Sequence, residues 1–174
     1  MITILADKTM SGMGQDMFEQ VSKTNKNAKY FCLEGMRIEP CYACRACNEK
    51  TNGKCIIRDD ADIILPYIAR SKAIIIFTPI VYGGYSFQIK RIIDKFSLIM
   101  DNHYRFYKGE LVKGNSAGVN YHVIGVQDGN DTEEASVFKQ FIAETRNIVS
   151  WTGQTIIMPR DAAGYDALIQ EIIE

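Results

Sequence analysis

The residues with the most distinctive chemistry are four cysteines in one short segment, Cys41-x2-Cys44-x2-Cys47-x7-Cys55. Three thiolates spaced two residues apart can bind neighbouring corners of a compact inorganic cluster, and a fourth from nearby can close it. This spacing favours a [4Fe–4S] cluster over a [2Fe–2S] cluster. Zinc is the rival, although all-thiolate zinc sites usually separate two Cys-x2-Cys pairs by a longer span. Four ordinary loop cysteines are the plain alternative, and Cys32, in a predicted strand, fits a small buried hydrophobe.

A second segment with chemical potential runs from Asp7 to Gly14, between a predicted strand and a predicted helix. The start of a helix presents N–H groups and the positive end of its dipole, which suits a phosphate group. Hydroxyl groups add donors there, and glycines allow the backbone to approach closely. The candidate phosphate-binding residues are Thr9, Ser11, Gly12, Met13 and Gly14. Asp7 opposes this role unless its carboxylate points away or pairs with Lys8. A simple turn between strand and helix is the alternative.

Two further loops follow predicted strands. The segment from Thr78 to Tyr85 contains a proline, two adjacent glycines that permit unusual turns, and two tyrosines. Such a loop can offer backbone groups and an aromatic face to a flat heterocycle, and a plain turn is the alternative. The segment from Gln127 to Asp131 is a turn by composition. The candidate ring-binding residues are Pro79, Ile80, Val81, Tyr82, Gly83, Gln127, Asp128 and Gly129.

The elements that position these loops alternate between strand and helix. Strands are predicted at residues 3–5, 28–33, 73–78, 119–126 and 154–158, and helices at 15–23, 59–70, 86–100, 132–150 and 165–173. This alternation predicts an α/β fold of the flavodoxin-like type, with a five-stranded parallel sheet in the order 2-1-3-4-5 and helices on both faces. A six-stranded nucleotide-binding arrangement competes. In both, ligands bind beyond the carboxyl ends of the strands.

Composition excludes several classes of protein. The 174 residues are 47% hydrophobic, and 20 Lys and Arg against 21 Asp and Glu give a net charge of −1. That balance argues against a nucleic-acid binder, and the apolar runs are too short to cross a membrane. We expect one domain over residues 1–174, with a cysteine loop at about 40–57. Only two histidines are present, and no serine or cysteine lies in an elbow motif, so a hydrolytic triad has little support.

The beginning of the sequence bears on the expected compartment. The chain opens with Met1-Ile-Thr-Ile-Leu5, without a basic segment followed by a long apolar stretch, so we expect a cytoplasmic protein. In a reducing compartment the five cysteines are not expected to form structural disulfides.

The segment from Cys41 to Asp60 resembles the cysteine loop of the flavodoxin-like NAD(P)H-dependent FMN reductases, most closely their iron–sulfur flavoprotein branch. The segment from Thr78 to Lys95 is similar to that family's Ser-Pro-Val-Tyr-Phe-Gly loop and the helix behind it, with the loop tyrosine displaced by one position. The first loop departs from the family's Gly-Ser-Pro-Arg pattern. It resembles the Thr-x-Thr-Gly-x-Thr loop of flavodoxins, with Gly14 in place of the last threonine, and we expect Gly14→Thr to strengthen FMN binding.

The resemblance implies an FMN-dependent oxidoreductase that takes electrons from NAD(P)H or a small redox protein. It implies that the flavin performs hydride transfer without a protein acid or base, and that the four loop cysteines hold one [4Fe–4S] cluster, which relays single electrons. An FMN-only reductase without the cluster and a non-catalytic electron carrier are the alternatives. A homodimer or homotetramer is expected, because the segment 101–118, expected to be a long connection, carries aromatic residues with no evident core.

Overall fold

The fold was derived from a computed structural model that describes residues 1–160 apart from 52, 102, 108 and 114–117. The strands are β1 (Ile2–Ala6), β2 (Ala28–Cys32), β3 (Ala73–Pro79), β4 (Tyr104–Tyr107), β5 (Glu110–Lys113), β6 (Asn120–Gln127) and β7 (Thr155–Pro159). The helices are α1 (Ser11–Thr24), α2 (Ala46–Glu49), α3 (Ala61–Ala69), α4 (Phe87–Asp94) and α5 (Thr132–Val149), with short 3-10 turns η1 (Lys8–Met10) and η2 (Lys95–Leu98). None of the helices in this part of the chain has both the length and the apolarity needed to cross a membrane.

Five strands form one parallel sheet in the order β2-β1-β3-β6-β7. Counted within the sheet alone, this is the order 2-1-3-4-5, so the predicted flavodoxin-like fold is confirmed. The central strand β3 reads Ala-Ile-Ile-Ile-Phe-Thr-Pro and is buried over five of its seven residues. A continuously apolar strand suits this place because parallel sheets are covered on both faces.

Alternate residues of the strands build two separate cores. Ile4, Ile75 and Ile124 face one side of the sheet, where Met17 and Val21 of α1 pack against them. The other face packs against α3, α4 and α5, whose buried residues include Ile64, Leu65, Ile68, Ile89, Ile92, Phe138 and Ile142. This period-two alternation fixes the register, since a shift by one residue would exchange the two faces.

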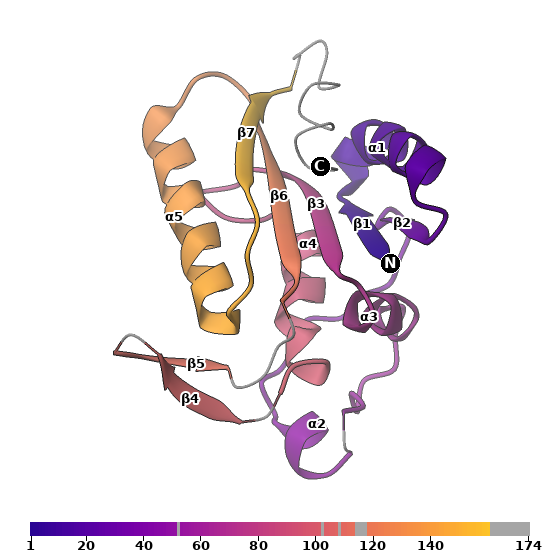
Figure 1. The fold of residues 1–174 in the computed structure, drawn as a ribbon, viewed down its shortest axis with the longest axis vertical. Coiled ribbons are helices and arrows are strands. Elements are labelled where there is room, and N and C mark those ends of the chain that lie inside the picture. The colour runs from indigo at the N-terminus through magenta and orange to yellow at the C-terminus, as the bar shows by residue number, and fades with distance from the viewer. Residues whose placement is uncertain (52, 102, 108, 114–117, 161–174) are drawn as a thin grey trace.

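The segment between α4 and β6 differs from the sequence prediction. The sequence predicts a long connection at residues 101–118, but β4 and β5 pair antiparallel in this segment and form a two-stranded hairpin beside α5 (Figure 1). Strand β4 does not show the apolar–polar alternation that predicts a strand, because all four of its side chains face solvent and none alternates inward. The predicted helix at 86–100 is also shorter, ending as α4 at Asp94 and continuing as η2. The predicted helix at 165–173 lies outside the described residues.

Candidate functional site

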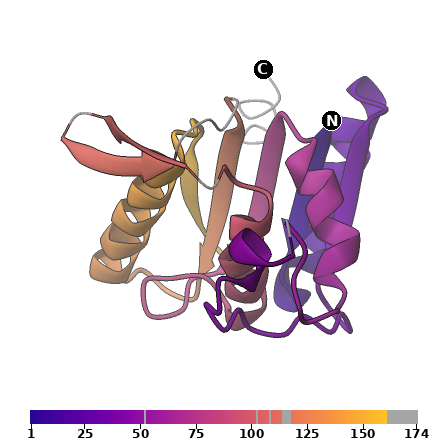
Figure 2. The same ribbon diagram turned by 90° about the horizontal axis from the view of Figure 1, so that it is seen from below.

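Three of the predicted loops meet at the carboxyl edge of the sheet. The N–H of Asp7 donates to the carbonyl of Phe77 (2.9 Å), and the N–H of Ile80 donates to the carbonyl of Val126 (2.8 Å). In Figure 2 the connections at this end of the strands run along the lower edge of the sheet. The structure therefore brings together the candidate phosphate-binding and ring-binding segments, as the strand order requires.

The candidate phosphate segment is folded into helix almost from its start. Thr9 lies in η1, and Ser11, Gly12, Met13 and Gly14 form the first turn of α1. Ser11, Gly12 and Met13 are at least partly accessible, whereas Gly14 is buried. A helix start of this kind attracts an anion.

Gly14 is required by packing, which corrects the expectation for Gly14→Thr. A Cβ atom at this position would lie 2.7 Å from the Cβ of Ala6 and 2.7 Å from Cε2 of Tyr30. Real Cβ atoms do not approach other atoms so closely, so α1 would have to move off β1 and β2. The glycine is therefore explained by close helix–sheet contact, and a threonine there is not expected to improve ligand binding.

The second loop projects an aromatic ring into solvent. Tyr82 is 99% exposed and has a φ of 49°, in the left-handed region. The turn is closed by reciprocal backbone hydrogen bonds between Val81 and Gly84 (3.0 and 2.9 Å). The N–H of Gly83 donates to Oε1 of Glu134 in α5 (3.2 Å), which holds the loop against the start of that helix. Pro79 and Ile80 lie deeper, at the end of β3 and next to β6. The loop thus exposes the ring of Tyr82, while its backbone is held against the start of α5.

The third loop contains a buried amide that is only half satisfied. Nε2 of Gln127 donates to the carbonyl of Gly129 (3.0 Å), whereas Oε1 of Gln127 is buried without a partner in the described part of the chain. Buried polar atoms are rarely unpaired in proteins, so such an acceptor calls for a donor. In the same loop, Asp128 forms a bidentate ion pair with Arg160. The hydrogen bonds from Arg160 hold the pKa of Asp128 below its ordinary value.

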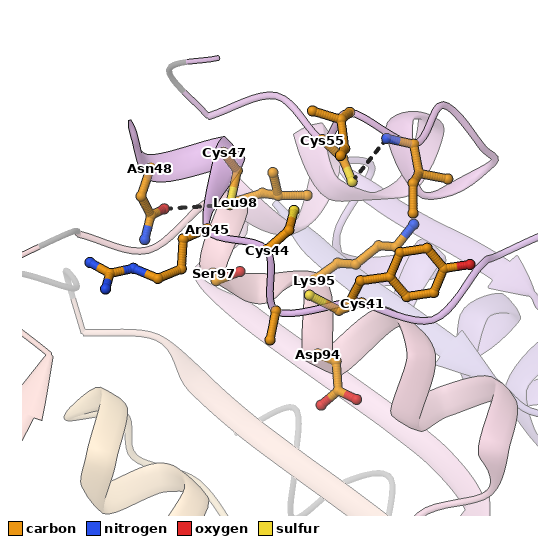
Figure 3. Close-up of a pocket in the computed structure, with 14 residues that line it drawn as sticks. Cys41, Cys44, Arg45, Cys47, Asn48, Cys55, Asp94, Lys95, Ser97 and Leu98 are labelled. Atoms are coloured by element: carbon orange, nitrogen blue, oxygen red, sulfur yellow. Dashed lines mark hydrogen bonds between the residues drawn. The ribbon is translucent and has the colours of Figure 1, made fainter. Parts of the chain in front are cut away.

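The four loop cysteines line one hollow. Cys41, Cys44, Cys47 and Cys55 border a cavity of about 280 Å³, together with residues of α4 and η2 (Figure 3). The N–H of Ile57 points at the sulfur of Cys55 (3.4 Å), and the sulfur of Cys47 contacts Oδ1 of Asn48 (3.5 Å). Ala43 and Arg45 have positive φ values of 52° and 59°, so the backbone turns sharply between the first three cysteines.

The side chains of these four cysteines are spread around the cavity and do not converge on one position. Within the described residues, no three His, Cys, Asp or Glu side chains lie close enough to share one metal ion. Cys32 lies in β2, outside the cavity, and forms no disulfide. The structure therefore separates the four predicted ligands from the fifth cysteine, as the spacing indicated.

A buried ion pair lies beneath the cysteine loop. Lys95, which lines the cavity, pairs with Asp59, and both side chains are 1% exposed. Asp59 also accepts hydrogen bonds from the N–H groups of Glu39 (2.7 Å) and Ala61 (3.0 Å), on the two sides of the loop. Asp60 accepts from the N–H of Arg37 (2.7 Å), so two adjacent carboxylates close the base of the loop.

Sequence reasoning missed part of this arrangement. The helix predicted at 59–70 agrees with the hydrogen bond from Ala61 to Asp59, but it implies neither the ion pair with Lys95 nor the bonds across the loop. A lysine among the apolar residues of the predicted helix at 86–100 was the available signal. Arg160 was also missed, because nothing near it in the sequence marks the end of β7 as part of the edge.

The resemblance implies two bound groups, FMN and an iron–sulfur cluster. The Oε1 of Gln127, unpaired among the described residues, could accept the ring N–H of a flavin, and the loop after β3 offers the exposed ring of Tyr82 at the same edge of the sheet, so the ring end fits. At the tail end, Ser11 and Gly12 offer donors at a helix start, but the two donors of Thr9 are already held by Asp7. For a cluster, four soft thiolate ligands around one cavity, with a buried cation on its wall, form a suitable donor set.

Comparison with known proteins places these features in a family context. Residues 7–134 match the family model described as NADPH-dependent FMN reductase. An iron–sulfur flavoprotein of Archaeoglobus fulgidus is 31% identical over 100 residues, which cover 58% of this chain and 49% of that protein. An iron–sulfur flavoprotein of Methanocaldococcus jannaschii is 30% identical over 81 residues, covering 47% of this chain and 41% of that protein. The matched segments thus span about half the length of these relatives or less.

A solved structure supports the fold independently. The crystal structure of an azoreductase from Bacillus anthracis strain Sterne superposes with a TM-score of 0.65 and covers 99% of this chain and 92% of that chain. The two sequences are 10% identical, so the likeness is one of fold.

Proposed function

Because this chain belongs to the NADPH-dependent FMN reductase family, we propose that it is an oxidoreductase that binds FMN and takes electrons from NAD(P)H or a small redox protein. The carboxyl edge of the sheet would hold the flavin, and the cysteine loop would hold one [4Fe–4S] cluster. The proposed flavin-site residues are those predicted from the sequence except Thr9, whose donors Asp7 holds, and Gly14, which packing explains. The cluster would lie on Cys41, Cys44, Cys47 and Cys55.

The observation that carries the flavin proposal is Oε1 of Gln127, which is buried and has no hydrogen-bond partner among the described residues. It lies at the end of β6, in the loop that the fold places beside the ligand edge. Leaving a buried acceptor unsatisfied costs about 1–3 kcal/mol, so a ligand that donates a hydrogen bond there regains this energy. The isoalloxazine ring carries such a donor on its pyrimidine portion.

In this proposal the protein binds and orients, and the cofactors carry the redox chemistry. FMN supplies two-electron exchange with NAD(P)H and one-electron exchange with other partners. Gln127 would fix the edge of the ring, while the loop from Pro79 to Gly83, braced on Glu134, would cover one side of it. No side chain is required to donate or accept a proton.

The cysteine loop would hold its group through four thiolates. An iron–sulfur cluster supplies one-electron transfer when bound, and backbone N–H groups directed at the ligand sulfurs, such as that of Ile57 at Cys55, tune such sites. Lys95 lines the same cavity, and its ammonium group is held there by the buried ion pair with Asp59.

The test is the absorption spectrum of protein purified without oxygen, combined with flavin, iron and sulfide assays. We expect flavin peaks, a broad additional band in the visible range, and oxidation of NAD(P)H with an added acceptor. A yellow protein without iron or sulfide would leave an FMN-only reductase. Bound flavin without NAD(P)H oxidation would favour an electron carrier.

Substitution of the cysteines one at a time tests the cluster ligands. Each of Cys41→Ser, Cys44→Ser, Cys47→Ser and Cys55→Ser should lower the iron content to a similar degree, because a cluster and the loop that holds it depend on each other. Cys32→Ser is the matched control and should retain iron, since that residue lies in β2. All five variants should retain flavin. Retention of iron in two or more of the four loop variants would exclude a shared cluster.

A further inference from the structure

The carboxylate of Asp7 caps η1, the short turn that leads into α1, within the segment predicted to bind phosphate. Asp7 directly precedes η1, which runs on into α1. Its Oδ1 accepts hydrogen bonds from both the N–H and the hydroxyl group of Thr9, each 2.9 Å long. A capping carboxylate satisfies donors of a helix start, and its charge interacts favourably with the helix dipole. Asp7 therefore places a negative charge in this segment and holds both donors of Thr9, whereas the first turn of α1 has no side-chain cap.

Asp7 is held in this place by its surroundings. Its side chain and backbone are 5% exposed. The N–H of Asp7 donates to the carbonyl of Phe77 in β3, and the carbonyl of Asp7 accepts from the N–H of Met10, both at 2.9 Å. The sheet and the turn thus fix the backbone from which the carboxylate projects.

Two cations near Asp7 are already paired with other carboxylates. Nζ of Lys8 lies 3.0 Å from Oε1 of Glu34. Arg160 is bound mainly by Asp128, and Asp7 adds only a weaker attraction that raises the pKa of the guanidinium further. A phosphate at this helix start would therefore meet a negative charge and would have to compete for each of these cations.

Building on the proposed flavin function, we propose that Asp7 is a specificity-determining residue that lowers the affinity of the site for the phosphate end of FMN. A phosphate monoester carries about 1.5 to 2 negative charges at neutral pH. Riboflavin has the same ring but no phosphate, so it avoids both the repulsion by Asp7 and the competition for the donors of Thr9. The wild-type protein then binds riboflavin about as tightly as FMN.

Titration calorimetry with FMN and with riboflavin tests this inference on the full chain and its variants. Asp7→Asn removes the charge and keeps an acceptor for Thr9, whereas Asp7→Ala also frees both donors of Thr9. We expect each variant to bind FMN at least about tenfold more tightly than wild type, on the scale of one charge–charge contact near a protein surface. Riboflavin affinity should change less than about twofold. Glu19→Gln, an exposed carboxylate further along α1 that contacts Gln15, is the control and should leave both affinities unchanged.

The outcomes separate this inference from the proposed function. Tighter FMN binding in the Asp7 variants, with riboflavin unaffected, supports the role of Asp7. Wild-type protein that strongly prefers FMN, or Asp7 variants that bind FMN no better, overturn that role while flavin binding itself stands. If none of the proteins binds either flavin while circular dichroism shows them folded, both the inference and the proposed flavin site are rejected.

Discussion

The ion pair of Lys95 and Asp59 lies wholly inside the protein, so each charge depends on the other. Removing one partner of a buried pair leaves an uncompensated charge in a medium of low dielectric constant. The backbone hydrogen bonds from Glu39 and Ala61 would still reach Asp59, but they carry no full positive charge. We therefore expect Lys95→Met to lower the free energy of unfolding by about 3–5 kcal/mol, measured by urea denaturation.

Lys90→Met is the matched control for this prediction. Lys90 pairs with Asp94 on α4, but both side chains are largely in water. Exposed pairs of this kind contribute about 0–1 kcal/mol. Equal losses of unfolding free energy in the two variants would show that burial does not make the ion pair of Lys95 more important for stability than the exposed pair of Lys90.

Asp59 also makes the stability of the protein depend on pH. Burial tends to raise the pKa of this carboxyl, but hydrogen bonds from Lys95, Glu39 and Ala61 outweigh it, and the pKa lies below the ordinary 3.8. A pKa lowered by folding contributes stability that is present above the unfolded value and is lost as pH falls through the folded value. The gap in unfolding free energy between wild type and Asp59→Asn should therefore narrow below about pH 4. A gap that stays constant down to about pH 2 would contradict this.

Helix α1 can lie close against strands β1 and β2 because position 14 has no side chain. Gly14→Ala would bring a Cβ to within 2.7 Å of Ala6 and Tyr30. Overpacking of a tight contact typically costs about 1–3 kcal/mol, and we expect a loss of unfolding free energy in that range. Gly12→Ala is the control, since a Cβ there meets no atom within 4 Å. It should be neutral or stabilise α1 by up to about 1 kcal/mol. The reverse order of stability would exclude packing as the reason for Gly14.

The elements that the sequence predicts well are those whose pattern matches their burial. Strand β3 is continuously apolar and covered on both faces, so it is unmistakable, and the βα alternation then leads to the sheet order. The hairpin β4–β5 was not predictable in this way, because its outward residues Tyr104, Phe106 and Leu111 show no inward alternation.

The predictable part of the candidate site is formed by residues that lie close together in the sequence or that the strand order brings to one edge. The cysteines of one loop and the loops after β1, β3 and β6 could be read from local sequence and strand order. The contacts that couple distant segments could not, since Lys95 meets Asp59, and Arg160 meets Asp128, only through the tertiary fold. Asp7 is intermediate: its charge is visible in the sequence, but its capture of both Thr9 donors is not.

The molecule as a whole presents an apolar surface away from the sheet edge. In Figure 1 the β4–β5 hairpin lies beside the lower end of α5. The exposed large side chains of this region are Tyr104, Phe106, Tyr107 and Leu111 on the hairpin and Ile148 near the end of α5. Gathered apolar groups of this size usually mark a protein–protein interface. All four residues of β4 are exposed, so a second copy that covers this strand would bury apolar surface and stabilise the hairpin.

We therefore expect the protein to form a homodimer or homotetramer through this hairpin. Light scattering after size exclusion should give a mass at least twice the 19.7 kDa of one chain. Phe106, which is 80% exposed, would be buried by a partner, so Phe106→Glu should shift the equilibrium to single chains, because a carboxylate at an apolar interface must lose its hydration. Ile63→Glu, on the exposed side of α3, is the control and should leave the mass unchanged. If wild type is a single chain, the hairpin aromatics are not an interface between copies. If Phe106→Glu remains an oligomer, the copies meet through another face.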